Sequence, residues 1–115
     1  MSDPRPRYAV VVLLAFEPAW LALPRERRAE VAAGLQAIVE RHPEVAVRWF
    51  DADAFGRGYT DFVVCECHDL ERYHFLWEEL RDSVLFTTPY ARLRDVVLGI
   101  ERGYQRFEAS VAAAG

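Results

Sequence analysis

Lysine is absent from this chain of 115 residues, and all 14 of its basic residues are arginine. Chemistry that requires a lysine amine, such as Schiff-base formation, is therefore excluded. Cysteine is scarce as well: two cysteines form at most one disulfide, so the chain is not a disulfide scaffold. An excess of basic charge is also missing. The formal net charge of −4 disfavours a generic nucleic-acid-binding protein, which needs a basic face.

Long apolar runs are absent too. The longest, Tyr8 to Phe16, has nine residues. It is shorter than the ~20 residues that cross a bilayer, and it lacks the flanks of a signal peptide. We therefore expect a cytoplasmic protein without membrane contact. The length and the hydrophobic fraction of 52% favour one globular domain over residues 8–113, after a flexible N-terminus over residues 1–7.

The hydrophobic pattern predicts four strands and three helices. The first run is apolar on both faces and rich in β-branched residues, which is typical of a buried central strand. Further strands are expected over residues 45–53, 59–67 and 93–100. Helices are expected after Pro24, after a cap at Asp69 and over residues 103–113. The apolar stripes of the first two helices are expected at Val31, Leu35, Ile38 and His42, and at Leu70, Tyr73, Trp77, Leu80 and Val84.

This order of elements predicts an α+β, ferredoxin-like βαββαβ fold with a C-terminal helix. The four-stranded antiparallel sheet has the expected strand order 4-1-3-2. Two helices cover one face of such a sheet, yet the first strand is apolar on both. The second face therefore needs a cover as well, and a second copy of the sheet would give a dimeric α/β barrel.

The second and third strands predict a pair of facing carboxylates. A hairpin centred on Gly56 pairs Trp49 with Val63, so that apolar residues meet, and it places Asp51 opposite Asp61. We expect both on the more apolar face, at the open end of the cleft between sheet and helices. They suit a general acid/base or a ligand anchor, with a raised pKa on one carboxyl or a cation nearby. Solvated residues near a turn and a metal site are the alternatives.

His74 is the third candidate catalytic residue. It lies on the flank of the second helix, with Glu71 and Glu78 at helical spacing, so it could transfer a proton or contact a ligand. A boundary histidine satisfied by Glu78 is the simpler alternative. Arg81 shares that flank and could neutralise an anionic group of a substrate.

Aromatic side chains are frequent around the predicted hairpin and second helix. Aromatic groups with polar tips suit a pocket for a flat organic ligand, although core packing explains most of them. The expected substrate-binding residues are Trp49, Phe55, Tyr73, Trp77, Arg81 and Tyr90.

The sequence offers little support for a metal or a phosphate-binding cofactor. Strand alternation places Cys65 and Cys67 on one face and His68 on the other, and no second cluster completes four ligands. Two small core residues explain the cysteines better. There is no glycine-rich phosphate loop, nucleophile elbow or zinc-protease motif. We therefore expect no metal and no cofactor.

Several long, irregular motifs resemble the darcynin family over about residues 8–108. They are Pro18-x-Trp20-Leu21-x-Leu23-x-Arg25-x-x-Arg28, Trp49-Phe50-Asp51-Ala52-x-Ala54-Phe55 followed by Asp61, Tyr73-x-Phe75, Leu80-Arg81-Asp82, Pro89-Tyr90, Asp95-Val96, and Ile100-Glu101-x-Gly103-Tyr104-x-x-Phe107-Glu108. The family pattern has Tyr where His74 stands, so a role of His74 would be particular to this protein.

The resemblance implies small bacterial proteins of the ferredoxin-like, dimeric α/β-barrel type, without settled activity or catalytic residues. That architecture includes cofactor-free monooxygenases, polyketide cyclases, isomerases and haem enzymes. Our leading hypothesis is an enzyme or binder of a small organic molecule, with cofactor-independent isomerisation, cyclisation or oxygenation. The alternatives are a non-catalytic module that binds a metabolite or a protein, and a haem-binding barrel in which His74 lies on the pocket wall.

A homodimer through the second sheet face is the expected assembly. That face offers Phe50 and Phe62, with Arg48 diagonal to Glu66 beside them. A charged pair within an apolar patch can set the register of two partners. Alternatively, the C-terminal helix could fold over this face through Tyr104, Phe107 and Val111.

Overall fold

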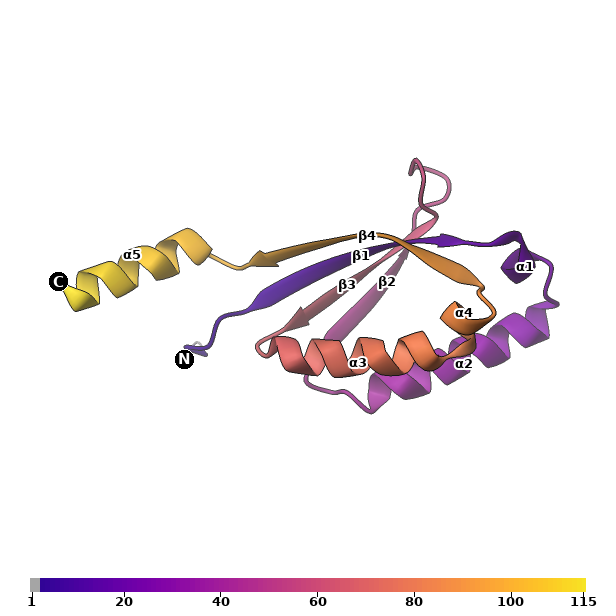
Figure 1. Cartoon of the computed structure of the whole chain (residues 1–115), viewed down its shortest axis with the longest axis horizontal. Coiled ribbons are helices and arrows are strands. Elements are labelled where there is room, and N and C mark those ends of the chain that lie inside the picture. Colours follow the sequence, from indigo (N-terminus) through magenta and orange to yellow (C-terminus); the bar gives the residue numbers. More distant parts are fainter. Residues whose placement is uncertain (1–2) are drawn as a thin grey trace.

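The strand β1 (Tyr8–Phe16) lies at the centre of the sheet, as its two apolar faces predict. In the computed structural model, which describes residues 3–115, it pairs antiparallel with β3 (Asp61–Cys67) and β4 (Ala91–Ile100). The strand β2 (Ala46–Asp51) pairs with β3, and the sheet order is β2-β3-β1-β4. The predicted fold and strand order are confirmed (Figure 1).

The two long helices, α2 (Arg25–Glu40) and α3 (Leu70–Asp82), lie on the same side of the sheet (Figure 1). The N-terminus of α3 is capped as predicted, since the Asp69 carboxylate accepts a hydrogen bond from the Glu71 amide at 2.9 Å. The inward faces of the helices pack against alternate residues of β1 and β3 to form the core. The fully buried residues of this core include Val10, Val12, Leu14, Val63, Cys65, Leu76, Leu80 and Leu85.

Two short helices are not predicted by the sequence pattern. They are α1 (Pro18–Leu21), directly after β1, and α4 (Val84–Thr87), before β4. Each has four residues, too few to show a helical periodicity. Val84 is therefore placed wrongly by the predicted stripe, because α3 ends at Asp82 and the next residue, Ser83, accepts a hydrogen bond from the Leu85 amide and caps α4.

His42 also lies outside the helix whose stripe it was expected to extend. The helix α2 ends at Glu40, and the His42 ring instead contacts the Glu79 carboxylate at 2.5 Å. That contact joins the end of α2 to α3. This contact, and not a position in the helical stripe, explains why the His42 ring is largely shielded from solvent.

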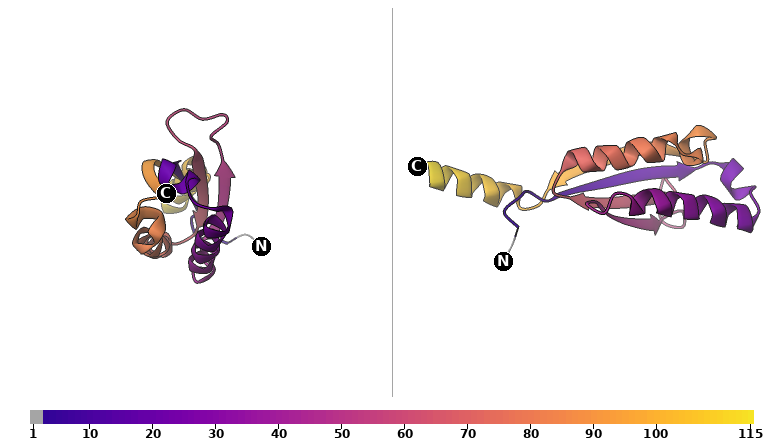
Figure 2. Two further views of the ribbon diagram at one scale, coloured as in Figure 1. Left: turned by 90° about the vertical axis from the view of Figure 1, so that its right-hand side faces the viewer. Right: turned by 90° about the horizontal axis from the view of Figure 1, so that it is seen from below.

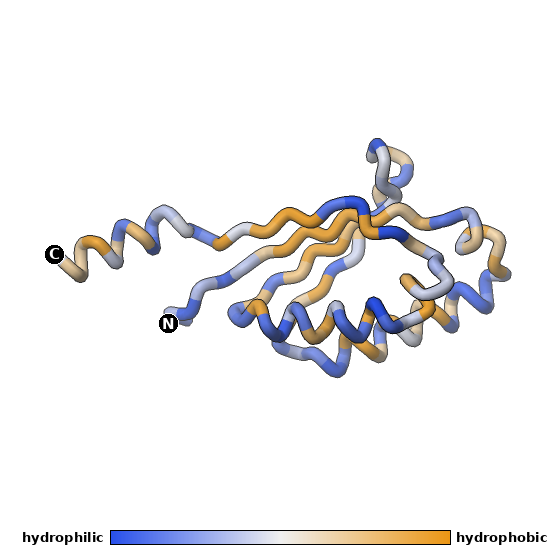
Figure 3. Tube along the Cα trace, in the orientation of Figure 1, coloured by the Kyte–Doolittle hydropathy of each residue, from blue (hydrophilic) through white to orange (hydrophobic). Residues whose placement is uncertain are grey.

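The C-terminal helix α5 (Gly103–Ala114) projects beyond the end of the sheet instead of folding over its second face (Figures 1 and 2). The alternative in which this helix covers the sheet is therefore wrong for the chain as described. Across residues 3–115, no helix lies on the second face, which we call the open face. The strands that form this face are strongly apolar (Figure 3).

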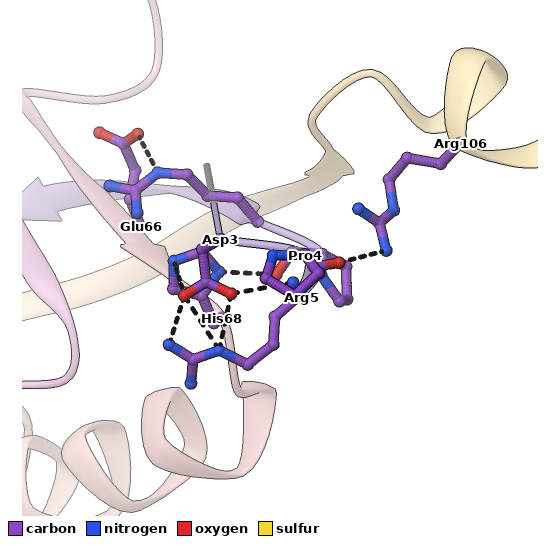
Figure 4. Close-up of polar contacts among 8 residues, drawn as sticks. Asp3, Pro4, Arg5, Glu66, His68 and Arg106 are labelled. Atoms are coloured by element: carbon purple, nitrogen blue, oxygen red, sulfur yellow. Dashed lines mark hydrogen bonds and ion pairs between the residues drawn. The ribbon is translucent and has the colours of Figure 1, made fainter. Parts of the chain in front are cut away.

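The segment before β1 contacts both the sheet and the base of α5 (Figure 4). The carbonyl of Pro6 contacts the His68 ring at 3.0 Å, and the carbonyl of Pro4 accepts a hydrogen bond from Arg106 at 3.1 Å. Of the predicted flexible N-terminus, residues 1 and 2 lie outside the described residues. Within residues 3–115, no helix has the length and apolarity needed to cross a membrane.

Candidate functional site

A cavity of about 530 Å³ lies between the sheet and the first two helices. Its walls come from β1, α1, α2, β2 and the start of β3, so the fold brings together segments that are far apart in the sequence. The apolar lining consists of Phe16, Trp20, Leu21, Ala32, Leu35 and Trp49, and the polar lining consists of Gln36, Asp51, Asp53, Thr60 and Asp61.

Asp51 and Asp61 lie directly opposite each other on β2 and β3, in the predicted register. Both line the cavity together with Leu35 and Gln36 of α2, so they lie on the helix-facing side as expected. The pair stands where the ladder between the two strands ends. The strands therefore fix both carboxyl groups at the polar end of an otherwise apolar cavity.

The pKa of Asp61 is raised to about 6. Burial is the main cause, because removal from water disfavours the carboxylate. A hydrogen bond with the Thr60 side chain opposes the shift, and the neighbouring carboxyl groups of Asp51 and Asp53 add to it. Asp61 therefore titrates close to neutral pH, where a carboxylic acid can both accept and return a proton.

Thr60 ties the polar end of the cavity to the central strand. Its amide donates to the Leu14 carbonyl at 2.8 Å, and its hydroxyl accepts from the Phe16 amide at 2.9 Å. Its carbonyl accepts from the Ala52 amide at 2.7 Å, which closes the base of the hairpin. These three bonds hold β1, β2 and β3 together next to Asp61.

Aromatic rings form one wall of the cavity. The Phe16 and Trp20 rings lie 5.2 Å apart, and Tyr90 meets Trp20 edge-on at 5.6 Å. Tyr90 is therefore buried behind the wall and positions a ring that lines the cavity. Trp20 lies on the unpredicted helix α1. In the sequence it is marked only by the Pro18–Leu21 motif of the family resemblance.

A second hollow of about 400 Å³ shares Trp20 and Ala32 with this cavity and is lined on its far side by Arg25 and Arg28. The Nε atom of Arg28 is buried there, without a hydrogen-bond partner in the described part of the chain. The cavity itself has no arginine or histidine among its lining residues. Arg25 and Arg28 thus lie beside the cavity and not at the Asp51–Asp61 pair.

Five of the nine predicted site residues lie on α3 or in the hairpin loop, outside the cavity lining. On α3, Tyr73 and Trp77 pack against each other at 6.1 Å, inside the core. His74 is 64% exposed and contacts Glu78 at 3.7 Å, and Arg81 points into solvent beside the same carboxylate. Phe55 is 90% exposed in the hairpin loop.

Both cysteines lie in the core, as their spacing predicts. Burial raises the pKa of Cys65 to about 11, and burial also raises the pKa of Cys67. Thiolate, the nucleophilic form, is therefore scarce at both positions near neutral pH. Neither sulfur lines the cavity.

A haem group does not fit the residues of this cavity. Haem iron requires an axial ligand such as histidine, and His42, His68 and His74 all lie elsewhere. Carboxylates at the polar end would also repel the carboxylate side chains of a haem. More generally, among residues 3–115 no group of three or more histidine, cysteine or acidic side chains is arranged to hold a metal ion.

The chain is similar to bacterial proteins along nearly all of its length. The family model of darcynin, described as a domain of unknown function, matches residues 2–114. Darcynin 1 of Acinetobacter baumannii is 40% identical over 90 residues, which cover 77% of this chain and 100% of that protein. Darcynin of Chromobacterium violaceum is 36% identical over 78 residues, which cover 68% and 99% of the two chains.

Among solved structures, the fold is similar to chlorite dismutase from Candidatus Nitrospira defluvii, with a TM-score of 0.75 at 13% identity. The match covers 87% of this chain and 42% of that one. The chain therefore spans less than half of the length of that protein. At this identity the likeness concerns the fold alone.

Proposed function

The chain belongs to the darcynin family, and for this member we propose a cavity that binds a small organic molecule and transfers a proton at its polar end. The observation that carries the proposal is the Asp51–Asp61 pair inside a cavity of about 530 Å³. Ligand sites have volumes of about 300–1,000 Å³ and mostly apolar walls with a few polar groups. This cavity has the same combination.

Asp61 is the proposed acid/base. A general acid/base works best when its pKa lies near the operating pH, and the pKa of Asp61 is raised to about 6. Asp51 is proposed to anchor the ligand beside it. Isomerisation and cyclisation agree best with such a pair, because the same carboxyl group takes a proton and returns it. Oxygenation additionally needs dioxygen, and no feature of the described residues marks a binding site for dioxygen.

The preferred ligand is neutral or cationic. Three carboxyl groups line the polar end, and no arginine or histidine is among the lining residues. An anionic group there would add to the repulsion that already raises the pKa of Asp61. Trp20 and Trp49 offer aromatic faces to the body of the ligand.

The test is a proton abstraction that needs no knowledge of the natural substrate. 5-Nitrobenzisoxazole loses its ring proton to a base, and its N–O bond breaks to give a coloured cyanonitrophenolate. Catalysis is expected in the full-length protein, with a rate that rises with pH and reaches a plateau above about pH 6. The Asp61→Asn variant should lose at least about 90% of this rate, since general base catalysis contributes roughly 100-fold or more.

Asp82→Asn is the matched control, because it removes one exposed carboxylate at the end of α3 that is not among the lining residues of the cavity. It should keep the rate and its pH dependence. Binding of 2-naphthol, followed by tryptophan fluorescence, separates the remaining outcomes. Binding without any proton abstraction would favour the non-catalytic module over the enzyme, and no binding at all would overturn the proposed site.

A further inference from the structure

The second hollow, of about 400 Å³, is lined by one face of α2. Its lining residues on this helix are Arg25, Arg28, Ala29 and Ala32, whose helical spacing places them on the same side. Trp20 of α1 completes the lining. Apart from the two arginines, the lining within residues 3–115 thus consists of alanine and tryptophan, so the hollow combines two cationic groups with small and aromatic walls.

The two arginines of the hollow lack acidic partners. Within residues 3–115, neither Arg25 nor Arg28 forms an ion pair, whereas Arg27 between them pairs with Glu30 at 3.0 Å. The buried Nε atom of Arg28 has no hydrogen-bond acceptor in the same part of the chain. A buried donor without an acceptor costs free energy, so an acceptor supplied by a ligand is favourable there.

The position of these arginines in α2 adds to the local positive potential. They are the first and fourth residues of the helix, and its N-terminus has no side-chain cap. This end of α2 lies next to α1, at the end of the molecule opposite α5 (Figures 1 and 2). The positive end of the helix dipole disfavours cations and favours an anion. An anion in the hollow would therefore offset the repulsion between the dipole and both guanidinium groups.

The hollow and the cavity meet along α2. Trp20 and Ala32 line both, and Gln36, one turn further along the helix, lines the cavity together with Asp51 and Asp61. At a rise of about 1.5 Å per residue, Arg28 lies about 12 Å from Gln36 along the helix axis. A ligand of about this length, such as a two-ring compound with a polar group at each end, can therefore occupy both spaces.

We propose that the substrate is an elongated organic acid whose carboxylate binds Arg25 and Arg28 in the hollow. This inference rests on the proposed function of the cavity and adds the substrate class. The apolar body of the substrate lies over Trp20, and the group that exchanges a proton lies at Asp61. At the carboxyl pair the ligand stays neutral or cationic, so its negative charge belongs at the opposite end. A carboxylate suits the hollow because a guanidinium group can donate two parallel hydrogen bonds to it.

Three related compounds test the inference at about pH 7. 2-Naphthol has no anionic group, 6-hydroxy-2-naphthoate carries a carboxylate at the opposite end of the rings, and 6-hydroxy-2-naphthamide has a neutral amide in its place. Calorimetric titration of the full-length protein gives the dissociation constant of each compound. The naphthoate should bind at least about tenfold more tightly than the amide, because its hydrogen bonds to the arginines are charge-assisted.

Substitution of single arginines locates the carboxylate. Arg25→Gln and Arg28→Gln should each remove most of the preference for the naphthoate and leave the binding of 2-naphthol unchanged. Arg27→Gln is the matched control, because it removes the same charge from the same turn of α2, at a residue that pairs with Glu30 and does not line the hollow. Since Arg25 and Arg28 have no partner to lose within residues 3–115, their variants should keep the midpoint of urea denaturation.

The outcomes distinguish a failure of this inference from a failure of the proposed function. Binding of 2-naphthol, with equal dissociation constants for the naphthoate and the amide, would keep the cavity as a ligand site and overturn the anion site. A preference for the naphthoate that survives both Arg25→Gln and Arg28→Gln would overturn the anion site as well. If none of the three compounds binds, the proposed function is wrong and this inference is wrong with it.

Discussion

At the scale of single residues, the exceptional group is Asp61. Its pKa in the folded chain, about 6, lies above the ordinary value of 3.8. Between these two values the folded chain binds more protons than the unfolded one, so its free energy of unfolding falls as the pH rises through this window. The stabilising state is the protonated one, and it is lost above about pH 6.

An Asp61→Asn variant removes this titration. At pH 8 we expect it to be more stable than the wild type by roughly 1 kcal/mol, after allowance for solvent screening of a half-buried group. At pH 4 the two proteins should differ little. Urea denaturation at both pH values measures the difference, with Asp82→Asn as the control. Equal stabilities of Asp61→Asn and wild type at pH 8 would mean that Asp61 is not destabilised by its surroundings.

At the same scale, the reactivity of the two cysteine thiols tests whether the core is closed to solvent. Because burial raises the pKa of both thiols, we expect a thiol reagent such as dithionitrobenzoate to leave Cys65 and Cys67 unmodified in the native state. Two equivalents should react once urea unfolds the chain. Rapid modification of the native protein would contradict the burial of β3 against the helices.

At the scale of elements, the cap of α3 is the simplest feature to test. The Asp69 side chain satisfies the Glu71 amide, so Asp69→Ala should lower the free energy of unfolding by about 1 kcal/mol. Asp69→Asn keeps an acceptor at the same position and should cost much less. Chemical denaturation of the two variants compares them directly, and an equal loss in both would argue against a capping role.

The hairpin shows how far sequence patterns reach at this scale. Apolar partners opposite each other predict the register around Gly56, and with it the facing Asp51 and Asp61, and the structure has this register. Cross-strand pairing is local, and a slip by one residue would move every side chain to the other face, so few registers agree with the pattern. The side of the sheet that Asp51 and Asp61 face follows from the same alternation of side chains along the strands.

The remaining walls of the cavity could not be predicted in this way. Trp20 lies on a helix of four residues, too short for a periodic signal, and its contact with Tyr90 joins segments far apart in the chain. His74 illustrates the opposite error. An apolar stripe defines which side of α3 faces the sheet, but it does not tell which flank borders a cavity. Here the cavity borders α2.

At the scale of the whole molecule, the unusual property is shape. A chain of 115 residues with a longest axis of 61 Å holds part of its apolar surface away from its own core. The two faces of the sheet therefore have different surroundings. The helix side encloses the cavity, whereas no helix among residues 3–115 covers the open face, so a variant on one side should leave the other intact.

Limited proteolysis can reveal whether the C-terminal helix α5 is covered in solution. Trypsin cleaves after arginine, and Arg106 lies on α5 between Tyr104 and Phe107. If the expected sheet-face dimer forms and α5 packs against the second copy, cleavage at Arg106 should be slow in the wild type. It should be at least about tenfold faster in Val97→Glu, because Val97 lies on the open face and its substitution would separate the copies without changing α5. The distant Asp82→Asn variant should be cleaved like the wild type. Equal cleavage of the wild type and Val97→Glu, at a concentration where only the wild type is dimeric, would show that α5 stays exposed in the assembly. The sheet faces would then be the whole contact.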